Sequence, residues 1–246
     1  AWAGSRAAFN SVVTVCEMNP EGTKVISEPV LVFDGNDGVN HTVEGPKFYK
    51  RNGYYYILAP AGGVVTGWQL ALRSKNVYGP YEVKRVMAQG STDINGPHQG
   101  AWVETNSGES WFVHFQDKAM YGRVIHLNPV KWTEGWPVIG EDKDGDGCGN
   151  PVLTYRKPSV PSSVRVNPAE SDEFDTTDLG LQWQWHSNYQ DLYGFTTPYG
   201  FIRLYSWPLS EKYINLWEAS NMLLQKFPAE TFTATTKAVS YTHLTL

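Results

Sequence analysis

Cysteine, charge and long apolar runs are all scarce in this chain of 246 residues. Its two cysteines, Cys16 and Cys148, are too few for a disulfide framework or a cysteine-rich zinc site. No apolar run approaches the roughly 20 residues that span a bilayer, so no membrane segment is expected. Only 18% of the residues are charged and the net charge is −5, which leaves no basic surface for a phosphate backbone. Nucleic acid is therefore not an expected partner.

Helical periodicity is missing as well. In its place the chain has 23 Gly, 15 Pro, 14 Tyr, 10 Trp and 10 Phe, a mixture that favours short strands joined by turns. Runs rich in β-branched and aromatic residues lie between turn clusters, most clearly at 12–15, 30–33, 54–58 and 111–115. With 41% hydrophobic residues the chain can bury a core. The sequence predicts an ordered, all-β protein.

Two hairpins along the chain resemble each other. The first turns at Asn52-Gly53 and the second at Asn106-Ser107-Gly108. Two further strands, 69–74 and 81–86, follow the first hairpin, so each unit has four strands. A four-stranded repeat of about 50 residues is typical of a β-propeller blade. The pattern gives half a blade before Glu44, a full blade to about Met87 and another from about Pro97 to about Ile139.

These blades set the predicted domains. Because a propeller closes with at least four blades, residues 1–156 are predicted to form a partial propeller that lacks its N-terminal part. The segment 157–170 is rich in Pro and Ser and is predicted to be a linker. Beyond it, the alternating run 181–186 and the strand-like runs 199–205, 221–227 and 232–237 predict the start of a β-sandwich over 171–239. The tail 240–246 resembles translated adaptor sequence and is predicted to be non-native.

Two related motifs stand where strands of neighbouring blades should begin. They are Glu44-Gly45-Pro46 and Gly96-Pro97-His98. A carboxyl group shielded from water in the channel of a propeller could stay protonated near neutral pH and act as a general acid. The alternatives are a glutamate that is hydrogen-bonded at a turn and a histidine that belongs to the core.

Other polar residues have weaker patterns. Arg123 follows a glycine at a strand start, where its guanidinium could bind sugar hydroxyls or a carboxylate, or form a surface ion pair with Asp117 or Glu104. The run from Asp142 to Gly147 copies the first half of a calcium loop. The last ligand position of such a loop falls on Leu153 instead of a glutamate, so a solvated acidic loop is favoured over an EF-hand.

Several ordered segments together resemble the glycoside hydrolases of family 43: 44–56, 73–82, 96–104, 121–126 and 135–139. The similarity is greatest to the branch of β-xylosidases and α-L-arabinofuranosidases that carries a C-terminal concanavalin-like β-sandwich, which 171–175 and 181–186 also resemble. The resemblance covers residues 1–239 and implies a five-bladed propeller.

The resemblance also implies roles for single residues. Glu44 matches the general acid of an inverting hydrolase, Arg123 an arginine of the sugar subsite, and His98 a channel histidine near a central metal or water cluster, commonly assigned as calcium. The family's base and a second aspartate that tunes the acid belong to segments before residue 1. The chain 1–246 by itself is therefore expected to be inactive.

The sequence thus predicts a glycosidase that releases terminal xylose or arabinose from xylan-derived oligosaccharides, with no organic cofactor. The predicted sugar-binding residues are Arg123, His98, Phe115, Gln116 and Trp68, although Trp68 lies in a strand pattern more typical of the core. The alternatives are a non-catalytic carbohydrate-binding protein and an interaction propeller. Because polymeric xylan lies outside the cell, a secreted or periplasmic bacterial protein is expected. The preference between the two sugars stays open.

Overall fold

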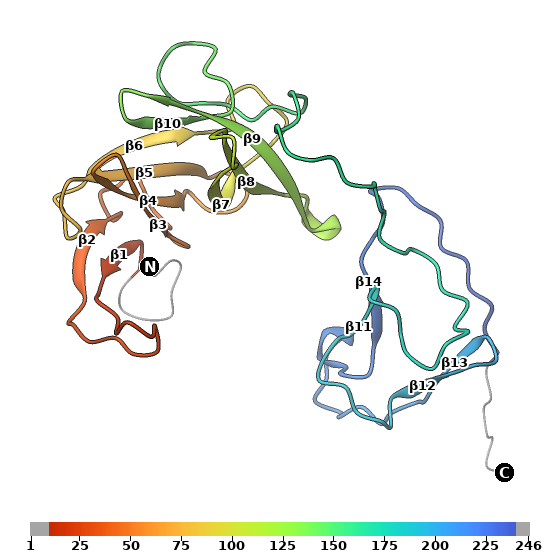
Figure 1. The fold of residues 1–246 in the computed structure, drawn as a ribbon. Coiled ribbons are helices and arrows are strands. Elements are labelled where there is room, and N and C mark those ends of the chain that lie inside the picture. The colour runs from red at the N-terminus through yellow and green to blue at the C-terminus, as the bar shows by residue number, and fades with distance from the viewer. Residues whose placement is uncertain (1–9, 240–246) are drawn as a thin grey trace. The chain divides into compact units, whose positions relative to one another are not determined.

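The computed structural model describes residues 10–239, so the predicted tail 240–246 lies outside the described residues (Figure 1). The chain divides into two compact units, residues 1–162 and 163–246. The described residues contain no α-helix and two short 3-10 helices, Ala119–Tyr121 and Leu216–Glu218. No helix in this part of the chain has the length and apolar character needed to cross a bilayer. The predicted all-β class is confirmed.

The N-terminal unit opens with a two-stranded sheet. Strands β1 (Val12–Val15) and β2 (Val30–Asp34) pair antiparallel, with a register shift between Val13 and Thr14. Val13 is buried and packs with Val43, Ile57 and Leu72 in a first hydrophobic core. This sheet therefore covers one face of the strands that follow it.

The first complete blade is a four-stranded antiparallel sheet in the order β3-β4-β5-β6. Its strands are β3 (Lys47–Arg51), β4 (Tyr54–Ala61), β5 (Trp68–Ser74) and β6 (Glu82–Met87). The predicted hairpin turn has positive φ at both Asn52 (48°) and Gly53 (77°), as a two-residue turn that matches the strand twist requires. The two inner strands, β4 and β5, are the most buried.

The second blade repeats this order. Strands β7 (His98–Glu104), β8 (Ser110–Asp117), β9 (Arg123–Thr133) and β10 (Trp136–Ile139) pair consecutively, and β9 is the long green strand of Figure 1. The predicted arrangement of two successive four-stranded blades is confirmed, and the fold is a partial β-propeller. The register of β7 on β8 shifts between His98 and Ala101.

The two blades pack face to face through a second core. Phe112 of β8 is fully buried against Leu58 and Ala71 of the first blade. A Cβ on Gly100 would come within 2.0 Å of the Phe112 ring. The Phe112 ring can therefore pack directly against the backbone of β7 because residue 100 has no side chain. The backbone N–H of Trp102 donates to the hydroxyl of Tyr49 at 3.0 Å and ties β7 to β3.

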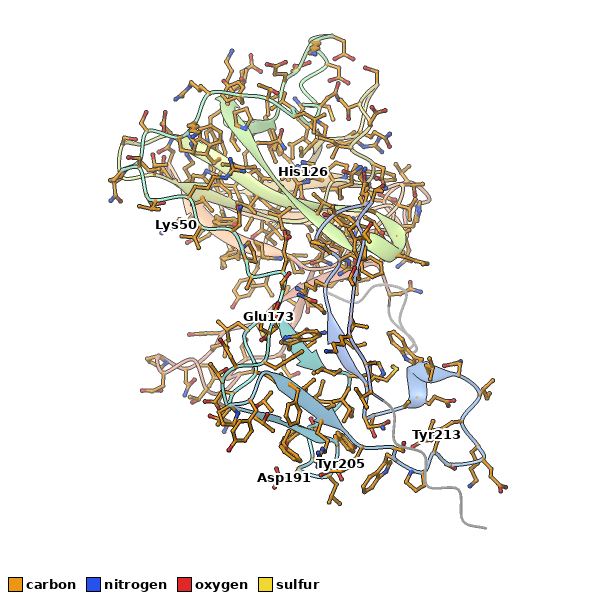
Figure 2. The ribbon with its side chains drawn as sticks, turned by 90° about the vertical axis from the view of Figure 1, so that its right-hand side faces the viewer. Lys50, His126, Glu173, Asp191, Tyr205 and Tyr213 are labelled. Atoms are coloured by element: carbon orange, nitrogen blue, oxygen red, sulfur yellow. The ribbon has the colours of Figure 1, made fainter. Side chains whose placement is uncertain are left out.

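The C-terminal unit contains two short sheets. Strand β11 (Trp183–Trp185) pairs with β14 (Leu223–Gln225), and β12 (Gly194–Thr197) pairs with β13 (Phe201–Leu204). Many of its aromatic side chains are exposed, among them Tyr205 and Tyr213, which are labelled in Figure 2.

One predicted strand of this unit is wrong and one strand was missed. Residues 232–237 are exposed and form no strand, because no neighbouring segment in the described range offers them backbone hydrogen bonds. Strand β12 has only four residues and begins with a glycine, so the run is too short to show an alternating pattern, although its phenylalanine and two threonines favour a strand. Antiparallel pairing with β13 completes it.

Candidate functional site

Glu44 and His98 come together from neighbouring blades. The carboxyl oxygen Oε1 of Glu44 lies 2.7 Å from Nε2 of His98, although 54 residues separate them in the chain. The His98 side chain is fully buried, whereas a third of the Glu44 side chain is exposed. The pair therefore has a buried side that fixes its geometry and a solvent-facing carboxyl group that a ligand can reach.

The loop before β3 holds Glu44 in place. Val43 is fully buried in the first core, and the backbone N–H of Glu44 donates to the carbonyl of Pro60 at 3.2 Å. Gly45 has a φ of +49° and lies against the Gln99 side chain, where a Cβ would come within 2.1 Å of its Oε1. The Glu-Gly-Pro motif thus needs its glycine for both backbone conformation and space.

His98 is enclosed at the start of β7. The ring of Phe115 on β8 lies 5.8 Å from it, centroid to centroid. On another side is Gly67, where a Cβ would come within 2.9 Å of His98 Nδ1. That nitrogen is buried and has no hydrogen-bond partner among the described residues.

The charge state of His98 follows from this enclosure. Burial lowers the pKa of His98 below its ordinary value, the Glu44 carboxylate opposes this in part, and Arg123 lowers the pKa further. A neutral imidazole can donate Nε2–H to a Glu44 carboxylate, or in its other tautomer accept a hydrogen bond at Nε2 from a Glu44 carboxylic acid. The contact is thus compatible with both protonation states that a general acid passes through.

Arg123 lies at the start of β9, beside the pair. Its guanidinium carbon is 4.5 Å from the centroid of the Phe115 ring, so the planar group stacks on an aromatic face. Arg123 is exposed and Phe115 is 7% exposed. This contact holds the guanidinium over the ring, and its N–H groups can meet a ligand oxygen. Glu44, His98, Phe115 and Arg123 are therefore brought together as one cluster.

The two other predicted sugar-binding residues are more enclosed. Gln116 is 5% exposed and its amide bonds within the protein. Trp68 packs against the first core, and the Arg85 guanidinium lies 4.0 Å from its ring centroid. Its indole N–H points to Oδ1 of Asn40 at 3.4 Å. The core alternative given for Trp68 matches this packing.

Sequence reasoning missed two residues of this cluster, Gly67 and Gln99. Gly67 forms a wall for His98, and Gln99 lies on Gly45. Gln99 directly follows the Gly96-Pro97-His98 motif but was given no role, and Gly67 stands in no motif, because each acts through a close approach between segments that are distant in the chain. A glycine before a strand is the only signal that Gly67 offers.

The described residues do not fit calcium at His98. Calcium takes six to eight oxygen ligands, whereas His98 offers one unpartnered nitrogen and its other nitrogen already contacts Glu44. Among the described residues, the group of three side chains close enough to share an ion is Asp142, Asp144 and Asp146, which excludes His98. The calcium expectation stays a prediction, and no step below passes through a metal.

The acidic loop itself bonds to its own backbone. Asp142 accepts hydrogen bonds from the N–H groups of Gly145 and Gly147 at 2.8 and 2.9 Å. Asp144 and Asp146 are exposed. These contacts explain the loop conformation without a bound ion, and they favour the solvated loop over a calcium site.

Two family profiles and a solved structure match this chain. The sequence profile described as "Glycosyl hydrolases family 43" matches residues 1–137, and the profile described as "Beta xylosidase C-terminal Concanavalin A-like domain" matches residues 171–242. The solved GH43 BlXynB protein from Bacillus licheniformis is similar with a TM-score of 0.73 and 29% identity, over 88% of this chain and 43% of that one.

Three curated relatives carry xylosidase or arabinofuranosidase names. A protein of Xylanibacter ruminicola, provisionally named a beta-xylosidase, is 42% identical over 92% of this chain and 42% of its own length. A beta-xylosidase of Formosa agariphila is 36% identical over 77% of this chain and 34% of its own, and a non-reducing end alpha-L-arabinofuranosidase of Bacteroides ovatus is 31% identical over 76% and 37%. The chain spans less than half the length of these relatives.

Proposed function

Because the chain belongs to glycosyl hydrolase family 43, we propose that the whole protein releases terminal xylose or arabinose from xylan-derived oligosaccharides. The observation that carries this proposal is the 2.7 Å contact between the partly exposed Glu44 carboxyl and the buried His98. The relatives named for xylosidase and arabinofuranosidase activity support the choice of sugars. Their names differ, so both sugars enter the test.

Glu44 is the general acid in this proposal. As the bond between the anomeric carbon and the glycosidic oxygen breaks, the Glu44 carboxyl gives its proton to that oxygen and becomes a carboxylate. His98, held neutral by burial, then stabilises the new carboxylate through Nε2–H. Arg123, stacked on Phe115, binds sugar oxygens.

The water that attacks the anomeric carbon needs a second carboxylate. In an inverting hydrolase this base lies roughly 6.5–9.5 Å from the acid, on the opposite side of the sugar. We assign no described residue to this role. The chain 1–246 alone is therefore expected to show no turnover, and the test uses the whole protein.

Substrates with poor and good leaving groups distinguish a catalytic acid from a structural glutamate at position 44. A general acid matters most when the leaving oxygen is a poor leaving group, so Glu44→Gln should lower kcat on xylobiose by about 10²- to 10⁴-fold. Hydrolysis of a dinitrophenyl xyloside, whose leaving group needs no proton, should fall far less. Nitrophenyl β-xyloside and α-L-arabinofuranoside compared on the wild type rank the two sugars.

Glu104→Gln is the matched control, because Glu104 is an exposed carboxylate on the same strand as His98. It should leave both rates unchanged. NMR of the first product formed should show the inverted anomer. An equal loss on both substrates with Glu44→Gln would argue against the acid role, and sugar binding without hydrolysis by the wild type would favour the non-catalytic alternative.

A further inference from the structure

A buried glutamine that follows Phe115 on β8 has its whole amide engaged inside the protein. Nε2 of Gln116 on β8 donates to the carbonyl of Asp93 at 2.7 Å and to Oδ1 of Asn95 at 3.0 Å. Its Oε1 accepts from Nε2 of His126 on β9 at 3.1 Å; His126 is labelled in Figure 2. Gln116 thus joins two inner strands of the second blade to the loop before β7.

That loop is joined in turn to the first blade. Nδ2 of Asn95 donates to the carbonyl of Val65 at 3.0 Å, in the turn between β4 and β5. The next residue, Gly96, has a φ of +47°, and a Cβ there would come within 2.3 Å of the carbonyl oxygen of Val64. The segments 62–67 and 93–97 are therefore in direct contact, with Asn95 as their hydrogen-bonded link.

Both segments are next to His98, one along the chain and the other in space. His98 follows the second segment directly, and Gly67 of the first segment lies against its ring at Nδ1. Within residues 10–239, Nδ1 of His98 has no hydrogen-bond partner to hold the ring from that side. Its orientation toward Glu44 therefore depends on the backbone that carries it and on the walls around it, and Asn95 fastens these together.

We propose that Gln116 is a positioning residue, which holds the segment 93–97 so that His98 meets Glu44. This inference rests on the proposed function, and it replaces the expectation that Gln116 binds sugar. With 5% of its surface exposed and its amide bonded to three partners, Gln116 has no free donor aimed at solvent. A sugar hydroxyl would have to displace one of these hydrogen bonds.

Kinetics of the whole protein separate the two roles. Gln116→Met keeps the side-chain length but removes all three hydrogen bonds. If Gln116 positions the acid pair, kcat on xylobiose should fall about 10- to 100-fold, as expected for a displacement of about 1 Å, while KM stays within about threefold. Hydrolysis of the dinitrophenyl xyloside should be less affected, because its leaving group does not need the acid.

A spectroscopic measurement tests positioning without activity. In protein labelled with ¹⁵N-histidine, the side-chain nitrogen signals of His98 should move in Gln116→Met. Asn95→Ala removes the hydrogen bonds of the Asn95 side chain to Val65 and Gln116, and Asn95 lies in a half-buried loop outside the blade core. This substitution should move the His98 signals as well. The control is Gln89→Met, since the Gln89 side chain donates to the carbonyl of Thr92 in the same connection. It should leave the His98 signals and kcat unchanged.

Two results would overturn the proposal. One is a rise in KM of more than tenfold at constant kcat in Gln116→Met, which would make Gln116 a sugar ligand. The other is an unchanged His98 spectrum in a folded Gln116→Met protein. If the spectrum moves while Glu44→Gln retains full activity, the positioning role stands and the acid assignment fails, so the two failures are distinguishable.

Discussion

At the scale of single residues, His114 of the second blade has a fully enclosed and hydrogen-bonded imidazole. His114 on β8 is 2% exposed, and its Nε2 lies 2.8 Å from Nδ2 of Asn128, whose Oδ1 accepts from the N–H of Val152. With Nε2 accepting, Nδ1 carries the proton and donates to the Phe115 carbonyl at 3.2 Å. His114 is therefore built into the blade as a neutral imidazole.

This arrangement predicts a pH-dependent stability. Burial lowers the pKa of His114 to about 4, the Phe115 carbonyl opposes this, and His126 adds to it. Between about pH 4 and 6.5 the unfolded chain binds the proton more readily, so stability rises with pH across this window and is lost toward pH 4. A shift of this size corresponds to about 3 kcal/mol in the free energy of unfolding.

Urea unfolding at pH 4 to 7 measures this contribution. His114→Gln keeps an acceptor for Asn128 and has no titrating group, so its stability should vary with pH by about 3 kcal/mol less than that of the wild type. His41→Gln, at an exposed histidine of the same unit, should keep the wild-type pH dependence. Parallel curves for wild type and His114→Gln would contradict the prediction.

The candidate site was predictable from sequence where a motif repeats or resembles a motif of a known family. Glu44 and His98 stand at equivalent places in two blades, and this repetition indicated a shared site. Gly67 and the bonds of Gln116 depend on close contacts between distant loops, which leave no pattern in either segment. The roles of all these residues stay predictions until the variants are measured.

At the scale of strands, the hydroxyl of Tyr49 is one of two that join the blades in the described range; the other is that of Tyr56, which donates to the carbonyl of Gly135 at 2.7 Å. Tyr49 of β3 accepts from the N–H of Trp102 of β7 at 3.0 Å, and its ring meets the Trp102 indole edge to face at 5.3 Å. Tyr49→Phe keeps the ring contact but leaves the N–H without its acceptor. It should lower the free energy of unfolding by about 1 to 3 kcal/mol.

Chemical denaturation followed by tryptophan fluorescence checks this value. Tyr78→Phe removes a hydroxyl from a tyrosine that is 39% exposed, so it should change stability by less than about 0.5 kcal/mol. An equal effect of the two substitutions would show that the hydrogen bond between Tyr49 and Trp102 adds no stability.

Strands were predictable where local signals agree. In 47–61 the alternation, the aromatic residues and the Asn52-Gly53 turn all favour one hairpin, and the structure has it with strands β3 and β4. Residues 232–237 have β-branched side chains but no partner strand in the described range. Strand formation there depends on pairing that local propensity does not contain.

At the scale of the whole molecule, the chain has two units, with a boundary at residues 162 and 163 inside the segment 157–170. All residues of this segment except the half-buried Pro158 are exposed, and it has no strand. Trypsin should cut the whole protein early after Arg165, because Lys157 precedes a proline and Arg156 is paired with Glu109. The linker bounds themselves stay a prediction.

Mass spectrometry of a time course should show an early new N-terminus at Val166. Arg73 and Lys84, which lie in the inner and outer strands of the first blade, serve as internal controls and should resist cleavage far longer. Early cleavage at either of them would show that the blade opens more readily than the segment between the units.

Because Glu44 and His98 come from different blades, the time at which their contact forms during synthesis depends on the second blade. The blade β3–β6 emerges from the ribosome before the second blade. Glu44 therefore emerges 54 residues ahead of His98. The first blade can form its own hydrogen-bonded sheet during that interval, but its carboxyl group stays solvated. A nascent chain therefore has no acid pair until the second blade has docked.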